Sequence, residues 1–282
     1  MTIRRPQAPL VAGWVLRRTR ELLELAPLAG AARLSSTAQD AVPPRRLRAR
    51  AGAGGMRGYL EGGAQAANEL ADALMVAGRR PADLESVLDL GCGAGRVIPH
   101  VAALAPQSRC AGCDVDAAAL DWARAHRPGI EWSLTSFEPP LPYASESFAL
   151  LYSISVFSHL GRGLQERWLH EVRRVLRPGG VALISIHGRH AFEQFRSGRV
   201  TTSWCSADVF SREPLRPRDF VFAPYVRSMW TVGELPGVGR DYGLAFAGSE
   251  HVRSTWSQAL EVVDVRERAM TSWQDIVILR KT

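Results

Sequence analysis

Short apolar segments alternate with amphipathic segments through most of this 282-residue chain, and this alternation restricts the fold more than any other feature. The first apolar segment, residues 86–90, has little polar alternation, which is typical of a strand buried on both faces of a parallel sheet. Strands are expected at residues 86–90, 109–114, 130–134, 148–154, 181–186, 260–265 and 273–279. Helices are expected at residues 59–77, 96–105, 117–126, 164–176 and 250–258. Strands and helices that alternate at this spacing form right-handed βαβ units, so the expected fold class is α/β with a doubly wound sheet.

The turn after the first strand, residues 91–95, contains three glycines. Ligands of doubly wound sheets bind outside the carboxyl ends of the strands, and glycine lets the backbone approach a ligand closely. The spacing is G-x-G-x-G and not the dinucleotide-binding G-x-G-x-x-G, because Arg96 follows Gly95. The second strand ends in Asp114, and an acid there can accept hydrogen bonds from both hydroxyls of a ribose. The two features predict a site for an adenosine without a 2′-phosphate.

Four motifs follow one another along the chain, at residues 87–96, at Asp114, at residues 141–149 and at residues 174–180. In this order and spacing the sequence resembles the class I S-adenosylmethionine-dependent methyltransferases over about residues 84–187. The resemblance implies a Rossmann-like, doubly wound sheet of seven strands with strand 7 antiparallel. It also implies S-adenosyl-L-methionine as the cofactor. The residues themselves add an N-terminal helical extension and a lid insertion after strand 5 to the expected fold.

A bacterial subgroup of this family is similar to the chain over most of residues 56–282. The shared segments are residues 59–63, SVFSHL at 155–160, residues 186–188 and WQDIVIL at 273–279. The acceptors of this subgroup are mostly unassigned. The resemblance therefore indicates the cofactor better than the acceptor.

The cofactor-binding residues that the resemblance implies all lie at or just after the ends of strands. They are Asp89, Gly91, Gly93, Gly95, Arg96, Asp114, Val115, Thr135, Ser136, Phe137, Ser153 and Ile154. The three glycines should pass under the methionine part and the ribose, and Asp89 should orient the turn and the amino end. Asp114 should hold the ribose hydroxyls, with Val115 against the adenine.

The later strand ends complete the expected cofactor site. Thr135 and Ser136 stand where the family often places an acid or an amide for the adenine amino group, so a hydroxyl there departs from the commoner pattern. Phe137 should pack on the adenine ring. Ser153 and Ile154 end the fourth strand, where backbone carbonyls usually meet the methionine amine.

Two histidines are the candidate catalytic residues. Methyl transfer from this cofactor is an in-line displacement, so the protein mainly aligns the acceptor, but a hydroxyl acceptor also needs a base. His159 follows the fourth strand and His187 follows the fifth, and both positions line the mouth of the site in this family. We prefer them to His190 because they match the subgroup, although each could also serve only in packing.

Two related chemistries are not expected. Methyltransferases that act on base amino groups carry Asn/Asp-Pro-Pro-Tyr directly after the fourth strand, whereas Pro139 and Pro140 precede that strand here. Metal-dependent catechol-type enzymes need a cluster of acids after the fourth strand, and the sequence has none there. We therefore expect no metal.

The formal charge of +7 is concentrated at the N-terminus. Residues 1–58 hold eleven arginines and three acids, so the rest of the chain is close to neutral. We expect a basic arm and linker at residues 1–55 and a methyltransferase domain at residues 56–282. The arm is interpreted as a helix packed on the body or a frayed tail, as a membrane-surface helix, or as a nucleic-acid arm.

Within the domain, residues 188–248 form an insertion rich in aromatic residues, interpreted either as an elaborate loop with its own core or as a lid over the acceptor. The chain shows no secretory signal, and its four cysteines make no disulfide framework. A cytoplasmic protein is expected, with peripheral contact at the inner membrane face through the arm as an option.

Three functions agree with these features. The first is a methyltransferase that acts on a small-molecule or glycan-type acceptor, at oxygen, without a nucleic-acid partner. The second is an RNA or protein methyltransferase that uses the basic arm. The third is a non-catalytic adaptor that binds S-adenosylmethionine. The intact glycines and Asp114 argue against the adaptor.

Overall fold

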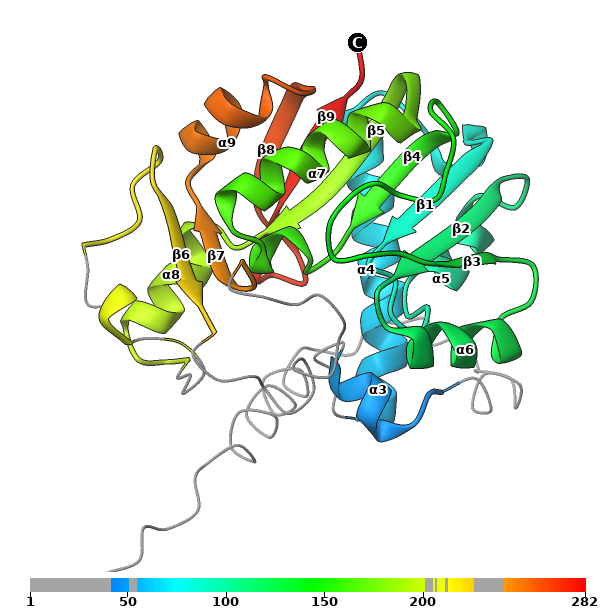
Figure 1. Ribbon diagram of the computed structural model, residues 1–282, viewed down its shortest axis with the longest axis horizontal. Helices are drawn as coiled ribbons and strands as arrows, with labels where there is room; N and C mark the ends of the chain where they lie inside the picture. The colour runs from blue at the N-terminus through cyan, green and yellow to red at the C-terminus, as the bar shows by residue number, and fades with distance from the viewer. Residues whose placement is uncertain (1–41, 51–54, 201–204, 206, 211–212, 226–240) are drawn as a thin grey trace, which may run out of the picture.

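A seven-stranded sheet forms the centre of the computed structural model, which describes residues 42–50, 55–200, 205, 207–210, 213–225 and 241–282 (Figure 1). Its strands are β1 (Ser86–Leu90), β2 (Arg109–Asp114), β3 (Glu131–Leu134), β4 (Phe148–Ser153), β5 (Leu176–Ile186), β8 (Glu261–Met270) and β9 (Gln274–Arg280). Their order across the sheet is β3-β2-β1-β4-β5-β9-β8. Strands β1 to β5 are parallel, and β9 runs antiparallel between β5 and β8. The expected Rossmann-like sheet with an antiparallel seventh strand is confirmed.

Helices cover both faces of this sheet (Figure 1). They are α4 (Met56–Val76), α5 (Ile98–Leu104), α6 (Ala117–His126), α7 (Arg162–Val175) and α9 (Ser249–Trp256), with a short 3-10 turn η1 (Pro81–Asp83) before β1. Side chains of α4 and α5 share one buried cluster with the sheet, and side chains of α7 and α9 share another. Each cluster forms because one face of these helices is apolar. None of the helices in the described part of the chain combines the length and the apolar character needed to cross a membrane.

Strand β5 begins earlier than the sequence indicates. The Pro178-Gly179-Gly180 motif predicts that the strand starts at Val181, whereas the structure starts it at Leu176. Leu176 pairs with Phe148, and the register then shifts before Leu150. The glycines therefore lie within an irregular strand and do not precede a regular one.

A short helix, α3 (Arg45–Arg50), occupies part of the segment for which a linker is expected. Leu47 is buried and packs with Ala94 and Ala119, and Arg50 forms an ion pair with Asp116. The structure differs here because one buried leucine and one ion pair attach this piece to the domain. Residues 1–41 of the expected basic arm, with its helical extension, lie outside the described residues.

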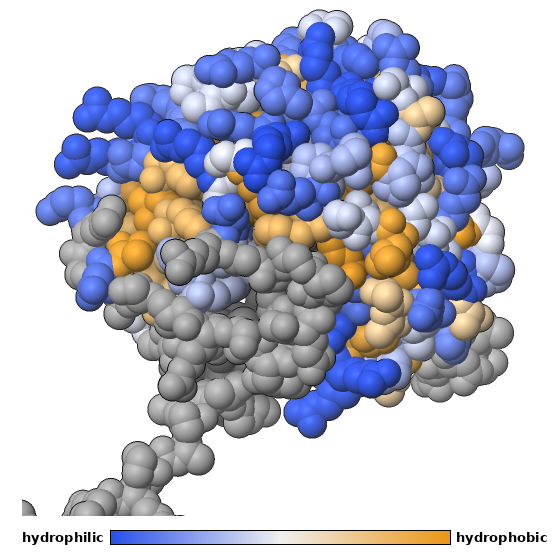
Figure 2. Space-filling view, viewed as in Figure 1, coloured by the Kyte–Doolittle hydropathy of each residue, from blue (hydrophilic) through white to orange (hydrophobic). Residues whose placement is uncertain are grey.

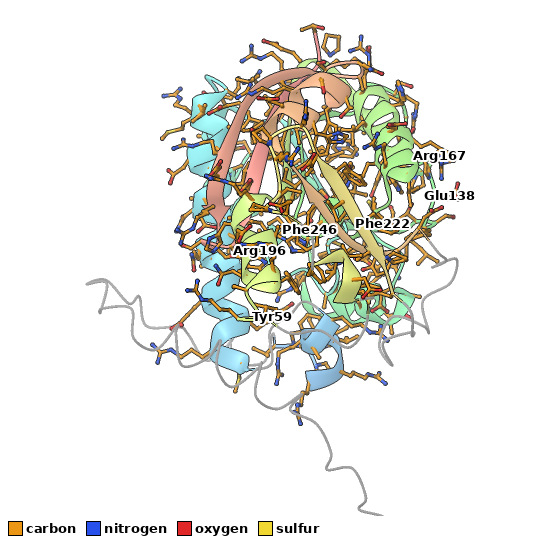
Figure 3. The ribbon with its side chains drawn as sticks, turned by 90° about the vertical axis from the view of Figure 1, so that its left-hand side faces the viewer. Tyr59, Glu138, Arg167, Arg196, Phe222 and Phe246 are labelled. Atoms are coloured by element: carbon orange, nitrogen blue, oxygen red, sulfur yellow. The ribbon has the colours of Figure 1, made fainter. Side chains whose placement is uncertain are left out.

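The insertion at residues 188–248 contains α8 (Arg189–Arg196), η3 (Ala207–Val209) and an antiparallel pair, β6 (Phe220–Pro224) and β7 (Gly243–Ala247). It has a core of its own, made of Ala191, Phe192, Cys205, Phe210, Leu215, Ala223, Leu244 and Phe246. Figure 3 shows Phe222 and Phe246 on its two neighbouring strands. Figure 2 shows hydrophobic side chains over β6 and β7, whereas the upper rim of the molecule is mainly hydrophilic.

Candidate functional site

The three glycines of the turn after β1 all have positive φ angles, +82° at Gly91, +53° at Gly93 and +69° at Gly95. A side chain at Gly91 would place its Cβ 2.2 Å from Cγ2 of Val156, which follows β4. A Cβ at Gly93 would meet nothing within 4 Å. The turn therefore needs glycine for its backbone, and it borders open space at Gly93.

Asp114, at the end of β2, holds this turn. Its Oδ2 accepts a hydrogen bond of 2.7 Å from the amide of Gly93, and its Oδ1 accepts one of 2.8 Å from the amide of Asp116. Burial raises the pKa of Asp114, and hydrogen bonds from the backbone, first those of Asp116 and Gly93, oppose the rise. Each carboxylate oxygen keeps a lone pair for a further donor. Asp114 can thus fix the turn and still accept hydrogen bonds from ribose hydroxyls.

Asp89 is buried within β1, and its Oδ2 accepts a hydrogen bond of 2.8 Å from the hydroxyl of Tyr152 on β4. Burial raises the pKa of Asp89 to about 7. Arg96 lies against α4, where a Cβ on Gly62 would be 3.0 Å from its Nη1. Burial lowers the pKa of this guanidinium. The structure therefore pairs Asp89 with Tyr152 of β4 and packs Arg96 against α4.

Tyr59 also lies in this region, although it was not among the residues predicted for the site. It is almost fully buried in α4, and its hydroxyl donates a hydrogen bond of 3.4 Å to the carbonyl of Ala94 in the glycine turn (Figure 3). Its place in the shared segment at residues 59–63 was the only signal. A Cβ at Gly63 would lie 2.3 Å from the carbonyl oxygen of Arg96, which explains why α4 carries glycine there.

The ends of β2 and β3 provide groups with different exposure. Thr135 donates its amide to the carbonyl of Asp114 at 3.0 Å, and its buried Oγ1 has no hydrogen-bond partner among the described residues. Ser136 is exposed, whereas Val115 and Phe137 are half-buried. Because β2 and β3 are parallel neighbours, Val115 and residues 135–137 follow strand ends at the same edge of the sheet as Asp114.

The side chains at the end of β4 are more buried than those at the ends of β2 and β3. The hydroxyl of the fully buried Ser153 donates a hydrogen bond of 2.9 Å to the carbonyl of Leu90. Ile154 is half-buried and packs against the α4 and α5 side of the sheet. The side chain of Ser153 is thus committed to β1, which leaves the backbone as its means of contact with a ligand.

His159 lies in η2 (Phe157–His159), the turn after β4. Its Nδ1 is 2.9 Å from the carbonyl oxygen of Gly243 and 3.0 Å from the hydroxyl oxygen of Tyr225. Because a carbonyl oxygen can only accept, Nδ1 carries the proton and Nε2 keeps the lone pair of a neutral imidazole. Burial lowers the pKa of His159, and the hydrogen bond to Gly243 partly opposes this. The site therefore presents a neutral imidazole in a fixed orientation.

His187, directly after β5, is buried beside His159. Their ring centroids are 5.7 Å apart in an edge-to-face arrangement, and the ring of His187 stacks on Phe246 of β7 at 5.3 Å. The carbonyl of His187 accepts a hydrogen bond of 3.0 Å from the amide of Ala247. The structure thus brings both candidate histidines together. His190, in α8, is half-buried and contacts Trp273.

Tyr225 and Tyr242 are site residues that the sequence indicated only as part of an aromatic-rich insertion. The ring of Tyr242 stacks on His159 with 5.5 Å between centroids, and it meets Phe137 at 5.8 Å. No local sequence pattern indicates these contacts, because they join residues far apart along the chain.

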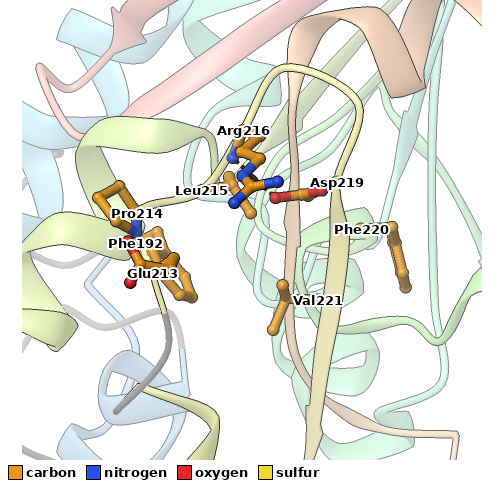
Figure 4. Close-up of a pocket in the computed structure, with 8 residues that line it drawn as sticks. All are labelled: Phe192, Glu213, Pro214, Leu215, Arg216, Asp219, Phe220 and Val221. Atoms are coloured by element: carbon orange, nitrogen blue, oxygen red, sulfur yellow. Dashed lines mark hydrogen bonds between the residues drawn. The ribbon is translucent and has the colours of Figure 1, made fainter.

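A pocket of about 560 Å³ lies elsewhere, within the insertion (Figure 4). It is lined by Phe192 of α8 and by residues 213–216 and 219–221. None of these lining residues is one of the candidate cofactor residues at the ends of the central strands. The pocket is therefore separate from the candidate cofactor site.

The candidate cofactor site lies where the strand order reverses, with β1 next to both β2 and β4. Ligands of doubly wound sheets bind at this place. The open space at Gly93, the available lone pairs of Asp114 and the unsatisfied Oγ1 of Thr135 fit a ligand that carries an adenosine.

Comparisons with known proteins agree with this geometry. Residues 87–180 match the family described as a methyltransferase domain. Malonyl-[acyl-carrier protein] O-methyltransferase of Methylococcus capsulatus is 32% identical over 127 residues, which are 44% of this chain and 44% of that protein. Trans-aconitate 2-methyltransferase of Azoarcus sp. is 34% identical over 135 residues, 48% of this chain and 52% of that protein.

Two further comparisons differ in what they show. The tRNA N(3)-methylcytidine methyltransferase Mettl2 of Drosophila melanogaster is 30% identical over 136 residues, 44% of this chain and 40% of that protein. The chain thus spans about half the length of the curated relatives it matches. The crystal structure of the PH0226 protein from Pyrococcus horikoshii has a TM-score of 0.50 at 15% identity, covering 70% of this chain and 82% of that one, which shows the fold alone. The family match, the relatives and the fold support a methyltransferase domain of class I at residues 87–180, with S-adenosylmethionine as the cofactor.

Proposed function

We propose that this chain is an S-adenosylmethionine-dependent O-methyltransferase that acts on a hydroxyl group of a small-molecule or glycan-type acceptor. The observation that carries the proposal is the contact of 2.9 Å between Nδ1 of His159 and the carbonyl of Gly243. This contact leaves Nε2 as a neutral base. A base is needed for a hydroxyl acceptor but not for a carboxylate acceptor.

The residues that would hold the cofactor follow the strand ends. Asp114 would accept hydrogen bonds from the ribose hydroxyls, while Val115 and Phe137 would face the adenine. The buried Oγ1 of Thr135 is available as a partner for an adenine nitrogen. When bound, the cofactor supplies a methyl group on a sulfonium, ready for in-line displacement.

His159 would take the proton of the acceptor hydroxyl at Nε2. The pKa of its imidazole is lowered by burial, so the ring is neutral at pH 7 and can accept. After it accepts the proton, the Nδ1–H of the imidazolium still donates to the carbonyl of Gly243 and lies next to the oxygen of Tyr225. These two oxygens stabilise the positive charge until the proton passes to water.

The surroundings of His159 support a hydroxyl acceptor over a charged one. Its neighbours include Tyr225, Tyr242 and the carbonyl of Gly243, which are uncharged groups. Two relatives are named for malonyl-[acyl-carrier protein] and trans-aconitate, and a carboxylate acceptor would call for a cation where this chain places rings.

The domain organisation belongs to the same proposal. The insertion at residues 188–248 would form the acceptor side, because β7 contributes Gly243 and Phe246 to the surroundings of the two histidines. The alternative of an RNA or protein acceptor depends on the basic arm, of which residues 1–41 lie outside the described part of the chain. Relatives that act on different acceptors leave that choice to experiment.

The test compares His159→Gln with His190→Gln, the same substitution at a histidine after the neighbouring strand. Transfer of labelled methyl groups from S-adenosylmethionine is measured against sets of simple phenols, alcohols, sugars and carboxylic acids. We expect His159→Gln to lower transfer to hydroxyl acceptors about a hundredfold to ten-thousandfold. Its dissociation constant for S-adenosylmethionine, measured by calorimetry, should stay within about twofold of the parent.

His190→Gln should leave both quantities unchanged. The rate of transfer should rise as the pH increases through the lowered pKa of His159, because only the neutral imidazole accepts a proton. Full transfer by His159→Gln, or transfer confined to carboxylic acids, would contradict the proposal. Absence of S-adenosylmethionine binding would contradict it as well.

A further inference from the structure

The backbone fixes Tyr242 between two parts of the molecule. Tyr242 pairs with Leu160 in an isolated antiparallel bridge, and the amide of Gly161 donates a hydrogen bond of 2.9 Å to the carbonyl of Asp241. On its other side, the amide of Tyr225 donates to the carbonyl of Tyr242 at 3.2 Å. The residue is thus held by the turn after β4 and by the segment after β6.

The ring of Tyr242 contacts both halves of the site, which are the acceptor side with His159 and the expected adenosine-binding end with Phe137. It stacks on the imidazole of His159, with 5.5 Å between centroids and an interplanar angle of 30°. It also meets the ring of Phe137 edge to face, at 5.8 Å and 72°. His159 follows β4 on the acceptor side, whereas Phe137 follows β3 at the expected adenine end.

The hydroxyl of Tyr242 interacts electrostatically with Asp114, on the cofactor side of the site. Burial raises its pKa to about 12, and the negative charge of Asp114 adds to the rise. The phenol therefore stays protonated, and it lies within electrostatic range of the carboxylate that is expected to hold the ribose.

We propose that Tyr242 is a positioning residue that couples the two half-sites, because its ring is a wall shared by the adenosine-binding end and the imidazole of His159. The inference rests on the proposed function and extends it. An adenosine seated against Phe137 and Asp114 sets the position of the Tyr242 ring. That ring, stacked on the imidazole, in turn sets the tilt of the His159 ring about its hydrogen bond to Gly243.

Tyr225 offers a matched control in the same insertion. Its hydroxyl oxygen is 3.0 Å from Nδ1 of His159, and its ring centroid is 5.6 Å from that of Tyr242. It therefore contacts the acceptor side directly, and within the described part of the chain no ring contact joins it to Phe137. A tyrosine that merely fills space near His159 should behave like Tyr225.

The experiment uses the full chain with adenosine as the probe, because adenosine carries the ribose and adenine without the sulfonium that would approach His159. The imidazole resonance of His159 is assigned by comparison with His159→Gln and followed by NMR during adenosine titration. In the parent protein we expect this resonance to move to a new position at saturation. In Tyr242→Leu we expect the movement to disappear at saturating adenosine, with binding weakened about five- to tenfold.

Two conservative variants complete the design. Tyr242→Phe keeps the ring, so it should keep most of the movement. Tyr225→Phe should change the starting position of the His159 resonance but keep the movement. Thermal unfolding of each variant checks that the fold is retained, and a Tyr242→Leu protein that fails to fold leaves the Phe variants and the parent response to decide.

A His159 resonance that adenosine does not move in the parent protein overturns the inference. So does a Tyr242→Leu protein that folds and responds like the parent, or a Tyr242→Phe protein that loses the response. The proposed function fails by a different observation, which is transfer that survives His159→Gln. The two failures are therefore distinguishable.

Discussion

The cofactor half and the acceptor half of this site are built in different ways. In the cofactor half, the hydrogen bond between Gly93 and Asp114 joins residues 21 positions apart, of which Gly93 follows β1 and Asp114 ends the adjacent β2. In the acceptor half, His159 is held by Gly243, 84 positions away, and by Tyr225, 66 positions away. Local backbone constraints thus determine the first half, whereas packing of an insertion determines the second.

The largest effect is expected in the cofactor half, at Gly91. An alanine there would place its Cβ 2.2 Å from Val156, in a backbone with φ of +82°. Left-handed strain of 1–2 kcal/mol and overpacking of 1–3 kcal/mol combine to a loss of about 3 kcal/mol in the free energy of unfolding. Urea denaturation measures this loss, and calorimetry should show S-adenosylmethionine binding reduced with it.

Gly93→Ala is the matched control for that variant. Its φ of +53° costs about 1 kcal/mol, but the new Cβ meets open space, so no overpacking is added. The folded variant then reports whether the cofactor occupies that space. Equal stability losses for the two alanine variants would show that contact with Val156 does not restrain the turn.

The second prediction concerns the acceptor half, at Asp275 of β9. Its carboxylate is buried against Gly188, where a Cβ would be 1.7 Å from Oδ2, and its Oδ1 accepts a hydrogen bond of 2.9 Å from the amide of Arg268. Burial raises the pKa of Asp275 to about 6. Because the unfolded carboxyl has a pKa near 4, the folded state loses stability as the pH rises from about 4 to 6.

Asp275→Asn should remove this loss and keep the hydrogen bond from Arg268. We expect the variant to be about 1 to 2 kcal/mol more stable than the parent at pH 8, and equally stable near pH 4. Urea denaturation at both pH values measures the difference. Other buried acids such as Asp89 titrate in both proteins and cancel. A variant that is less stable than the parent at pH 8 would show that the ionised carboxylate is compensated by its neighbours.

The glycine turn of the cofactor half could be predicted from the sequence because its determinants are local. Glycine at 91 and 95 is required by positive φ angles and by close neighbours, and Asp114 ends a strand whose apolar run is visible in the sequence. Asp116 caps α6, with its side chain accepting a hydrogen bond from the amide of Ala119. The double use of Asp114, as partner of the turn and as candidate for the ribose, was not visible.

The acceptor half was predicted only as a position. His159 and His187 were named because they follow β4 and β5, but their partners Tyr225, Tyr242 and Gly243 could not be chosen from an insertion rich in similar residues. No local sequence pattern predicts that β6 pairs with β7 or that Tyr242 pairs with Leu160, because both are tertiary contacts. For the same reason the attachment of α3 could not be predicted, since the ion pair joins Arg50 to Asp116, 66 positions later.

The smallest effect is expected at the contact between Arg50 and Asp116. Among the described residues, this ion pair attaches the N-terminal segment to the cofactor half. Arg50 pairs with Asp116, whose own amide donates to Asp114. Arg50→Ala should cost less than about 1 kcal/mol in the free energy of unfolding, since the guanidinium is partly exposed. The dissociation constant for S-adenosylmethionine should change less than about twofold, because the turn and the hydrogen bonds of Asp114 remain.

Asp116→Ala provides the contrast, since it also removes the cap of α6 and should cost about 1 kcal/mol more. Calorimetry of both variants with S-adenosylmethionine then measures how local the cofactor half is. If Arg50→Ala weakened binding tenfold or more, residues before the domain would be part of the cofactor site, and the division between a local half and an assembled half would not hold. A change confined to Asp116→Ala would place the determinants of cofactor binding within the strands, turns and caps that follow residue 86.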